Sequence, residues 1–206
     1  MNPSVWGPQV WTLLVGLCSC TDQSPEVVRR FITAVAKLLP CKKCRDNFHD
    51  YLAETPFPGE VAVDSQGTIL HSHDDMQLWL FNAKEAVNYK TKCKSITLAE
   101  FKDKCVLFPF MDPQLICRVS LILLLNNTHY GRDLSHFHPY MDSLVELTHK
   151  EAPLLSTDLN STWTDNESLR TVLVGALQAS QARTGREKQT AAEILRPLMK
   201  SVGNKL

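Results

Sequence analysis

Apolar residues recur along this chain at the three- and four-residue spacing of an α-helix. The clearest run follows Ser24, Pro25 and Glu26, which are typical of an N-cap, a first helical position and an acidic first turn. The apolar residues that follow at helical spacing are Val27, Val28, Phe31, Ile32, Val35, Leu38 and Leu39. The run stops at Pro40, so the pattern predicts a helix between residues 25 and 39.

The rest of the first half also has a helical pattern. We expect helices over residues 4–17, 41–53 and about 74–91, and from the Thr97–Glu100 capping box to Cys105. The segment 54–73 holds prolines, glycines and two short β-like runs, at 61–63 and 68–70. Such a composition predicts a loop or a small hairpin.

Pro109 and the pair Asp112-Pro113 mark a boundary near the middle of the chain. Asp112 followed by proline is typical of a new N-cap, so we predict one domain over 1–110 and a helical extension or small second domain over 111–206. In the second part we expect helices at 114–127, 133–150 and 165–182, the last opened by a Thr164–Glu167 capping box, and a polar helix near 187–200. The predicted fold class is all-α.

Charge and hydropathy exclude two classes of partner. Lys+Arg 22 and Asp+Glu 22 cancel, so no overall field favours a phosphate backbone, and we predict no nucleic-acid partner. The longest apolar stretches, 10–18 and 115–125, are shorter than the roughly 18–20 residues that span a bilayer, so we predict no transmembrane segment. The N-terminus resembles neither a signal peptide nor a transit peptide, and we expect the mature chain to begin at Met1.

The sharpest chemical feature is Cys41-Lys42-Lys43-Cys44-Arg45 at the start of a predicted helix. A helix N-terminus and adjacent cations stabilise a thiolate, so the pattern predicts an acidic, nucleophilic Cys41 in a redox dithiol. A zinc half-site completed by Cys18 and Cys20 is the alternative, although their one-residue spacing is poor for a tetrahedral site. A thioredoxin fold is excluded because it needs a βαβ framework.

Three sequence blocks together resemble the FAD-linked sulfhydryl oxidases of the Erv/ALR family. They are Trp6-Gly7-Pro8-Gln9-Val10-Trp11, the block from Pro40 and the Cys41–Cys44 pair through Phe48 to Tyr51, and Trp79 followed by Val87-Asn88. The blocks lie in the family's order and spacing and cover about residues 4–95. Within the family, the chain is most similar to the compact enzymes of large DNA viruses.

The resemblance implies a four-to-five-helix bundle that binds FAD and oxidises dithiols of protein substrates. Cys41 would exchange with the substrate, Cys44 would pass electrons to the flavin, and molecular oxygen would be reduced to hydrogen peroxide. The family positions that line or support the flavin are matched here by Gly7, Trp11, Phe48, Trp79, Val87 and Asn88. Without the resemblance, Trp6, Trp11 and Trp79 are better explained as plain core aromatics.

Several positions depart from the family pattern. Val15 stands where many members have a histidine, and Lys84-Glu85 stands in place of a His-Asn pair, so two polar flavin contacts are changed. Lys84 either neutralises the cofactor or is an exposed helix lysine. Cys93 replaces a lysine of the family, with Lys92 beside it; Lys90 and Lys94 are substitutes for that cation.

The other cysteines and histidines leave alternatives open. Cys18 and Cys20 are either a shuttle dithiol or two small buried residues. Cys93 is a candidate disulfide partner of Cys105, with Cys117 as the alternative. His71, His73, Asp74 and Asp75 are better explained as a loop-to-helix cap than as a metal cluster, so we predict no metal.

Assembly and location follow only from the resemblance. Family members are commonly homodimers through helices of the first bundle, and the added C-terminal helices offer a different interface. A viral enzyme would act in the host cytoplasm or the virion, because cytosolic thiols are otherwise kept reduced. The rival function is a non-catalytic helical adaptor, either zinc-stabilised or an oxidase-like fold without FAD. The sequence does not identify the physiological substrate.

Overall fold

The computed structural model describes residues 3–17, 24–55, 57–58, 73–107, 112–132, 134–151, 155, 158–159, 163–187 and 189–202. Over these ranges the regular structure is helical, which confirms the predicted all-α class. The expected hairpin, with its β-like runs, lies outside the described residues, as do Cys18, Cys20 and His71.

The first half of the chain forms the helices that the apolar pattern predicts. They are α1 (Pro3–Leu17), α2 (Pro25–Leu38), α3 (Lys42–Glu54), α4 (His73–Thr91) and α5 (Leu98–Leu107). Helix α5 opens with the predicted capping box: the Thr97 hydroxyl accepts the Glu100 N–H at 3.2 Å, and Glu100 Oε2 accepts the Thr97 N–H at 2.7 Å.

The second half adds helices that pack on the first. They are α6 (Pro113–His129), the 3₁₀ turn η1 (Leu134–His136), α7 (Phe137–Glu151), α9 (Asn166–Arg183) and α10 (Ala191–Val202). Helix α6 has the predicted Asp112 N-cap, whose Oδ1 accepts the Gln114 N–H at 3.0 Å. It ends where Gly131 takes a positive φ of 61°.

Two predicted caps differ from the structure. Helix α9 begins one residue later than the Thr164–Glu167 box: the N-cap is Asp165, which accepts N–H bonds from Glu167 and Ser168, while the Ser168 hydroxyl accepts the Asp165 N–H. At α2, Ser24 is the N-cap, but its side chain makes no capping hydrogen bond.

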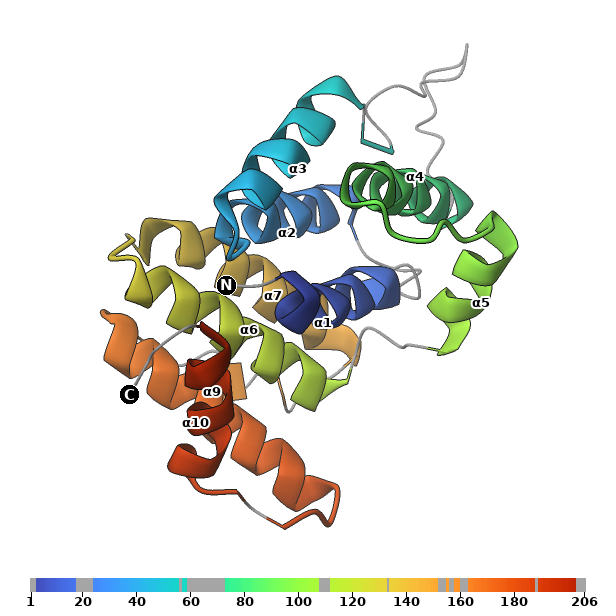
Figure 1. The fold of residues 1–206 in the computed structure, drawn as a ribbon. Helices are drawn as coiled ribbons and strands as arrows, with labels where there is room; N and C mark the ends of the chain where they lie inside the picture. Colours follow the sequence, from blue (N-terminus) through green and yellow to red (C-terminus); the bar gives the residue numbers. More distant parts are fainter. Residues whose placement is uncertain are drawn as a thin grey trace.

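One cluster of buried side chains runs through both halves of the chain. Helix α2 packs against α3 and against α7, while α6 packs against α1 and α9 (Figure 1). At the α2–α7 contact, the ring of Tyr140 stacks on Phe31 with centroids 5.3 Å apart, and both side chains are fully buried. Whether the predicted boundary at residue 111 separates two folding units stays a prediction.

No helix in the described part of the chain is long and apolar enough to cross a bilayer. The apolar run of α6 instead supplies core residues: Leu121, Ile122, Leu123 and Leu124 are each at most 1% exposed.

Candidate functional site

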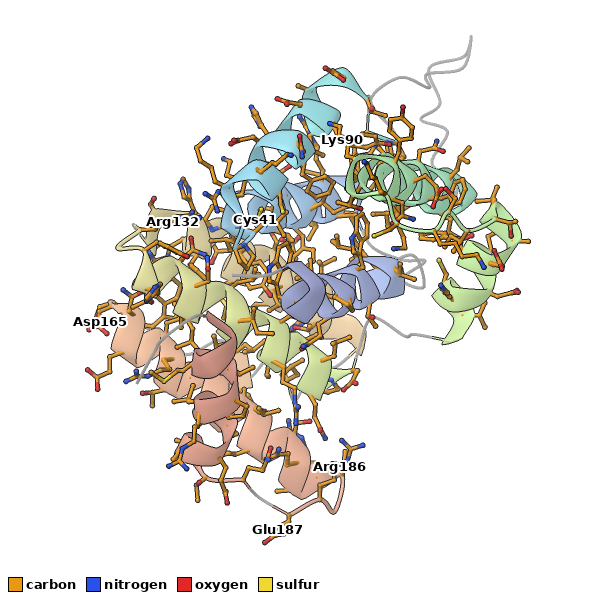
Figure 2. All side chains as sticks on the ribbon, in the orientation of Figure 1. Cys41, Lys90, Arg132, Asp165, Arg186 and Glu187 are labelled. Carbon is orange, nitrogen blue, oxygen red and sulfur yellow. The ribbon has the colours of Figure 1, made fainter. Side chains whose placement is uncertain are left out.

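Cys41 and Cys44 lie where α2 gives way to α3. Cys41 is the N-cap of α3, with an extended backbone, and its Sγ accepts the Cys44 N–H at 3.2 Å. Both cysteines are thiols and both side chains are partly exposed. The two predicted cysteines therefore lie together at the helix start, and Figure 2 shows Cys41 at the N-terminal end of α3.

The cations around the pair have different roles. Lys42 bonds Asp46 at 2.7 Å on the exposed side of α3, and Arg45 turns back to donate to the Leu39 carbonyl at 2.6 Å. Burial raises the pKa of the Cys44 thiol to about 12, with the Cys41 side chain adding to the rise and the Arg45 charge opposing it. The inner thiol of the reduced pair thus holds its proton at neutral pH.

Because the Cys44 thiol holds its proton, we expect an alkylating reagent to modify Cys41 and Cys44 at different rates. At pH 8 a thiol with a pKa of about 12 is a thiolate in roughly one molecule in ten thousand, and only the thiolate is nucleophilic. Brief treatment of the reduced protein with iodoacetamide should therefore label Cys41 at least about tenfold faster than Cys44. Peptide mass mapping measures both rates, and the exposed Cys93 thiol serves as an internal reference. Equal labelling of Cys41 and Cys44 would contradict the description of Cys44 as the inner, protonated thiol of the pair.

Aromatic side chains continue from the pair along the inner face of α3. Phe48 is buried, and its ring centroid lies 6.4 Å from that of Trp11 on α1 and 6.5 Å from that of Tyr51. Tyr51 meets Trp79 of α4 edge-on at 5.4 Å and donates its hydroxyl to the Trp79 carbonyl at 3.3 Å. Three separate helices therefore contribute to one aromatic cluster beside the dithiol.

Two indole N–H groups in this region are buried without an acceptor in the described part of the chain. They belong to Trp6 and Trp79, which are 4% and 5% exposed. A buried donor without a partner is rare in native proteins, so each of these indoles is available to donate to a bound group. The resemblance assigned Trp79 to the flavin, and this unpaired donor is compatible with that assignment.

Lys84 is half-buried against the cluster. Its Nζ is 5.1 Å from the centroid of the Trp11 ring, and burial lowers the pKa of its ammonium group, with the nearby Lys104 charge contributing. The alternative of an exposed helix lysine is therefore wrong. Val15 is 4% exposed in the core, whereas a Cβ built on Gly7 would meet open space.

The end of α4 brings the remaining predicted contacts together. Asn88 donates to Glu85 Oε1 at 2.7 Å, and the same oxygen accepts the Ile96 N–H at 3.4 Å, so the Glu85 carboxylate ties α4 to the connection before α5. Burial opposes the shift, but a hydrogen bond from Ser95 together with those from Asn88 and Ile96 lowers the pKa of Glu85. Lys92 ends α4 in the left-handed region with φ 57°, and its side chain is exposed. Val87 is half-buried.

The remaining cysteines do not form the disulfide considered from the sequence. Cys93 is a free, exposed thiol, whereas Cys105 is 1% exposed on the inner side of α5, so the two are not joined. Cys117 is a free thiol in the core. Among the described residues, no group of three or more histidines, cysteines, aspartates or glutamates is arranged to hold a metal ion.

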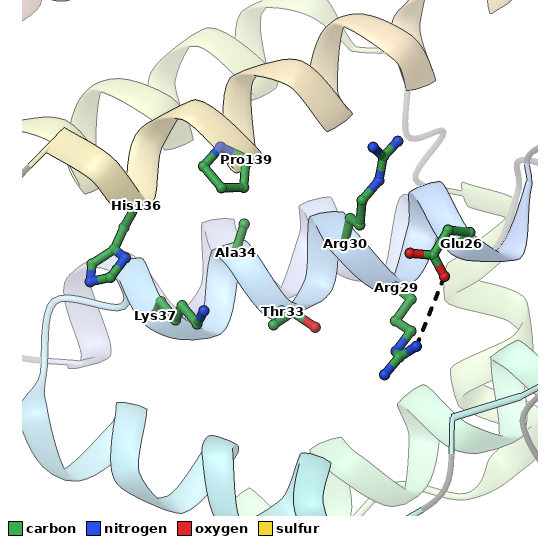
Figure 3. Close-up of a pocket in the computed structure, with 8 residues that line it drawn as sticks. All are labelled: Glu26, Arg29, Arg30, Thr33, Ala34, Lys37, His136 and Pro139. Atoms are coloured by element: carbon green, nitrogen blue, oxygen red, sulfur yellow. Dashed lines mark ion pairs between the residues drawn. The ribbon is translucent and has the colours of Figure 1, made fainter.

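A surface recess of about 310 Å³ lies on the other side of α2, facing η1 and α7 (Figure 3). Arg29, Arg30 and Lys37 line it, and Arg29 pairs with Glu26 at 3.9 Å. No lining residue comes from α3 or α4, so this recess is separate from the dithiol site.

Sequence reasoning missed the residues that the second half of the chain contributes. Asn126 and Asn127 of α6 are buried and donate to the Pro40 and Leu38 carbonyls, next to Cys41. The sequence pattern that could have indicated them is a pair of adjacent asparagines at the end of an apolar helix. Tyr51 was part of the recognised block, but its hydrogen bond to α4 was not anticipated.

Comparisons with known proteins find similarity over the first half of the chain. Residues 6–105 match the Erv1 / Alr family. A protein of Acanthamoeba polyphaga mimivirus named "probable FAD-linked sulfhydryl oxidase" is 29% identical over 105 residues, covering 48% of this chain and 68% of the relative. A protein of Invertebrate iridescent virus 3 named "putative FAD-linked sulfhydryl oxidase" is 27% identical over 93 residues, covering 43% of this chain and 57% of the relative. No solved structure matches.

Proposed function

Residues 6–105 belong to the Erv1/Alr family, and from this premise we propose that the chain is an FAD-linked sulfhydryl oxidase that forms disulfide bonds in protein substrates. The observation that carries the proposal is the Cys41–Cys44 dithiol at the start of α3, directly beside the aromatic cluster. Both viral relatives have names that describe this activity.

The exchange steps follow from thiol chemistry. A substrate thiolate attacks the Cys41 sulfur of the oxidised pair, so a mixed disulfide forms and Cys44 is released. The second substrate thiolate then attacks its partner sulfur in that mixed disulfide, which closes the substrate disulfide and releases Cys41. Two electrons and two protons have then moved from the substrate to the pair. FAD, when bound, would accept these electrons and deliver them to molecular oxygen, which becomes hydrogen peroxide.

The residues beside the dithiol fit an aromatic, negatively charged cofactor. The unpaired indole N–H of Trp79 is a hydrogen-bond donor, Trp11 and Phe48 supply apolar ring faces, and the half-buried ammonium of Lys84 supplies positive charge. We assign these four to the cofactor, with Gly7, Val15, Val87, Asn88 and Lys92 as the further contacts. The Asn88 amide also bonds Glu85, so it contributes through its remaining hydrogen-bonding capacity.

The role assigned to Lys84 gives a measurable expectation. Because its ammonium is held over Trp11, replacing Lys84 with glutamine should weaken FAD binding roughly two- to tenfold. The dissociation constant is measured by fluorescence titration of flavin-free protein. Lys37→Gln, an exposed lysine of α2, is the matched control and should leave the constant unchanged. Unchanged FAD affinity in both variants would remove Lys84 from the cofactor site.

Partners and location complete the proposal. The substrates are dithiols of proteins, molecular oxygen is the acceptor, and a viral enzyme would act in the host cytoplasm or the virion. We retain a homodimer as part of the proposal, and sedimentation velocity tests it. Since α6 and α7 pack on α1 and α2 within one chain, the dimer interface would have to use other surfaces.

The deciding experiment is the visible absorption spectrum of the purified protein, followed by oxygen uptake after addition of dithiothreitol. An oxidase shows a flavin spectrum, consumes oxygen and accumulates peroxide. A colourless protein that stays inert after incubation with FAD would overturn the proposal in favour of a helical adaptor, and its zinc content would then be measured.

A further inference from the structure

Three consecutive backbone carbonyls precede Cys41, and each accepts a hydrogen bond from a side chain. Helix α2 ends at Leu38, and the backbone is extended at Leu39 with φ −51° and ψ 136°. The Leu38 carbonyl accepts from Asn127 Nδ2 at 3.1 Å, and the Pro40 carbonyl accepts from Asn126 Nδ2 at 3.5 Å. The carbonyl between these two, that of Leu39, accepts a hydrogen bond from the Arg45 guanidinium. The segment 38–40 is therefore held along its whole length.

Two of these three donors come from the second half of the chain. Asn126 and Asn127 lie near the end of α6, 86 and 89 residues beyond the carbonyls that they bind. Their side chains are 0% and 2% exposed. A buried amide is costly unless it is hydrogen-bonded; the Nδ2 donors of both side chains are satisfied by these bonds, whereas the Asn126 Oδ1 has no partner among the described residues.

The orientation of the Asn127 amide is fixed from both ends. Its Nδ2 also donates to the Leu123 carbonyl at 2.7 Å, and its Oδ1 accepts from Arg132 at 3.2 Å. The Arg132 N–H in turn binds the Asn127 carbonyl at 2.9 Å. Figure 2 shows Arg132 at the end of α6.

The held segment leads directly into the redox pair. Cys41 has an extended backbone, φ −97° and ψ 123°, and this conformation points its Sγ at the Cys44 N–H. If segment 38–40 shifted, the Cys41 backbone would turn and this bond would be lost. The stability of the reduced pair therefore depends on contacts that α6 makes.

We propose that Asn126 and Asn127 are positioning residues for the Cys41–Cys44 pair, through which the C-terminal helices stabilise its reduced form. The expected effect of these residues on catalysis rests on the proposed oxidase function. Their expected effect on the dithiol–disulfide equilibrium of the pair is independent of that function. Loss of the Asn127 donor makes the reduced form less stable, so the pair becomes harder to reduce.

The test measures the equilibrium of the pair with glutathione, in which the protein disulfide and two glutathione thiols give the protein dithiol and oxidised glutathione. Asn127→Leu keeps the number and branching of the side-chain heavy atoms but removes the amide donor and acceptor. It should shift the equilibrium toward the protein disulfide roughly three- to tenfold, and a tenfold change corresponds to about 30 mV. Kinetically, kcat for dithiothreitol oxidation should change by a similar factor at unchanged flavin content.

Ser120→Ala is the matched control on the same helix. Ser120 is fully buried and bonds the Ile116 carbonyl and the Tyr140 hydroxyl, so its loss lowers stability without touching segment 38–40. Arg132→Ala is the milder second variant if Asn127→Leu fails to fold, because Arg132 is partly exposed and acts on segment 38–40 only through Asn127.

A wild-type glutathione equilibrium in Asn127→Leu, or in Arg132→Ala where that variant replaces it, would overturn the proposal. So would an equal shift in Ser120→Ala, because a positioning role would then be indistinguishable from general destabilisation. Since the equilibrium is measured without oxygen uptake, a protein that proves inactive would disprove the oxidase function while leaving this result interpretable.

Discussion

Replacing Cys44 with serine should abolish dithiol-driven oxygen consumption, lowering kcat by at least about a thousandfold, while the purified protein keeps its flavin. The reason is stoichiometric. The pair stores two electrons only as a disulfide that becomes two thiols, and a single Cys41 can form mixed disulfides but cannot resolve them internally. Cys44 is also the inner member, raised in pKa by burial beside the aromatic cluster.

A Cys44→Ser variant also separates the two candidate functions. The serine hydroxyl is close in size to the thiol, and the Cys44 side chain is only half-buried, so the fold should persist. An oxidase would lose turnover and retain flavin, whereas a zinc-stabilised adaptor would lose metal and unfold. Oxygen-electrode rates and the absorbance ratio of flavin to protein give both readouts.

Cys93→Ser is the matched control for this experiment. Cys93 is an exposed, free thiol just beyond α4, and its removal changes the cysteine count equally without altering the pair. Its kcat should stay within about twofold of the wild-type value. Full activity in Cys44→Ser, or equal loss in Cys93→Ser, would show that the electrons take a different route.

The second large effect is on stability. Tyr140→Ala should lower the free energy of unfolding by about 3–5 kcal/mol, because a fully buried ring is removed from the contact between α2 and α7. The ring stacks on Phe31 and meets Phe137 edge-on at 5.9 Å, so the surrounding side chains have little freedom to fill the cavity.

Tyr140→Phe isolates the hydroxyl of the same residue. Tyr140 and Ser120 share a hydrogen bond of 2.7 Å, and Ser120 keeps its bond to the Ile116 carbonyl when the phenol is lost. The expected cost is therefore only about 1 kcal/mol. Urea unfolding followed by circular dichroism measures both variants, and a cost below about 1 kcal/mol in Tyr140→Ala would contradict the packing argument.

The shape of the same unfolding curves tests the predicted division at residue 111. If residues 1–110 and 111–206 are independent units, Tyr140→Ala should split the transition in two. If the shared core makes them one unit, the curve stays a single step with a lower midpoint.

The sequence predicted helices best where local physics decides them. The apolar face of α2, its Pro25 start and the Thr97–Glu100 box each depend on residues a few positions apart, so the pattern contains the answer. The start of α9 was misplaced by one residue because Thr164 and Asp165 are both good caps, and only the actual hydrogen bonds distinguish them.

The site was predictable where its residues share one helix and unpredictable where helices meet. Cys41, Cys44 and Phe48 repeat along α3, and their common face follows from helical spacing. The burial of Lys84 against Trp11 is a contact between α4 and α1, about seventy residues apart, which no local pattern encodes. The same limit applies to Asn126 and Asn127, because the carbonyls that they bind lie at the end of α2 and in the connection from α2 to α3.

The packing of α7 on α2 also determines when this protein can fold during synthesis. Helix α2 ends at Leu38 and α7 starts at Phe137, so the apolar face of α2 leaves the ribosome about a hundred residues before its cover. At roughly 5–20 residues per second, that interval lasts on the order of ten seconds. During that time the nascent chain exposes the Phe31 ring and an unrestrained Cys41–Cys44 pair. The dithiol segment therefore reaches its final packing only after α6 and α7 have been synthesised.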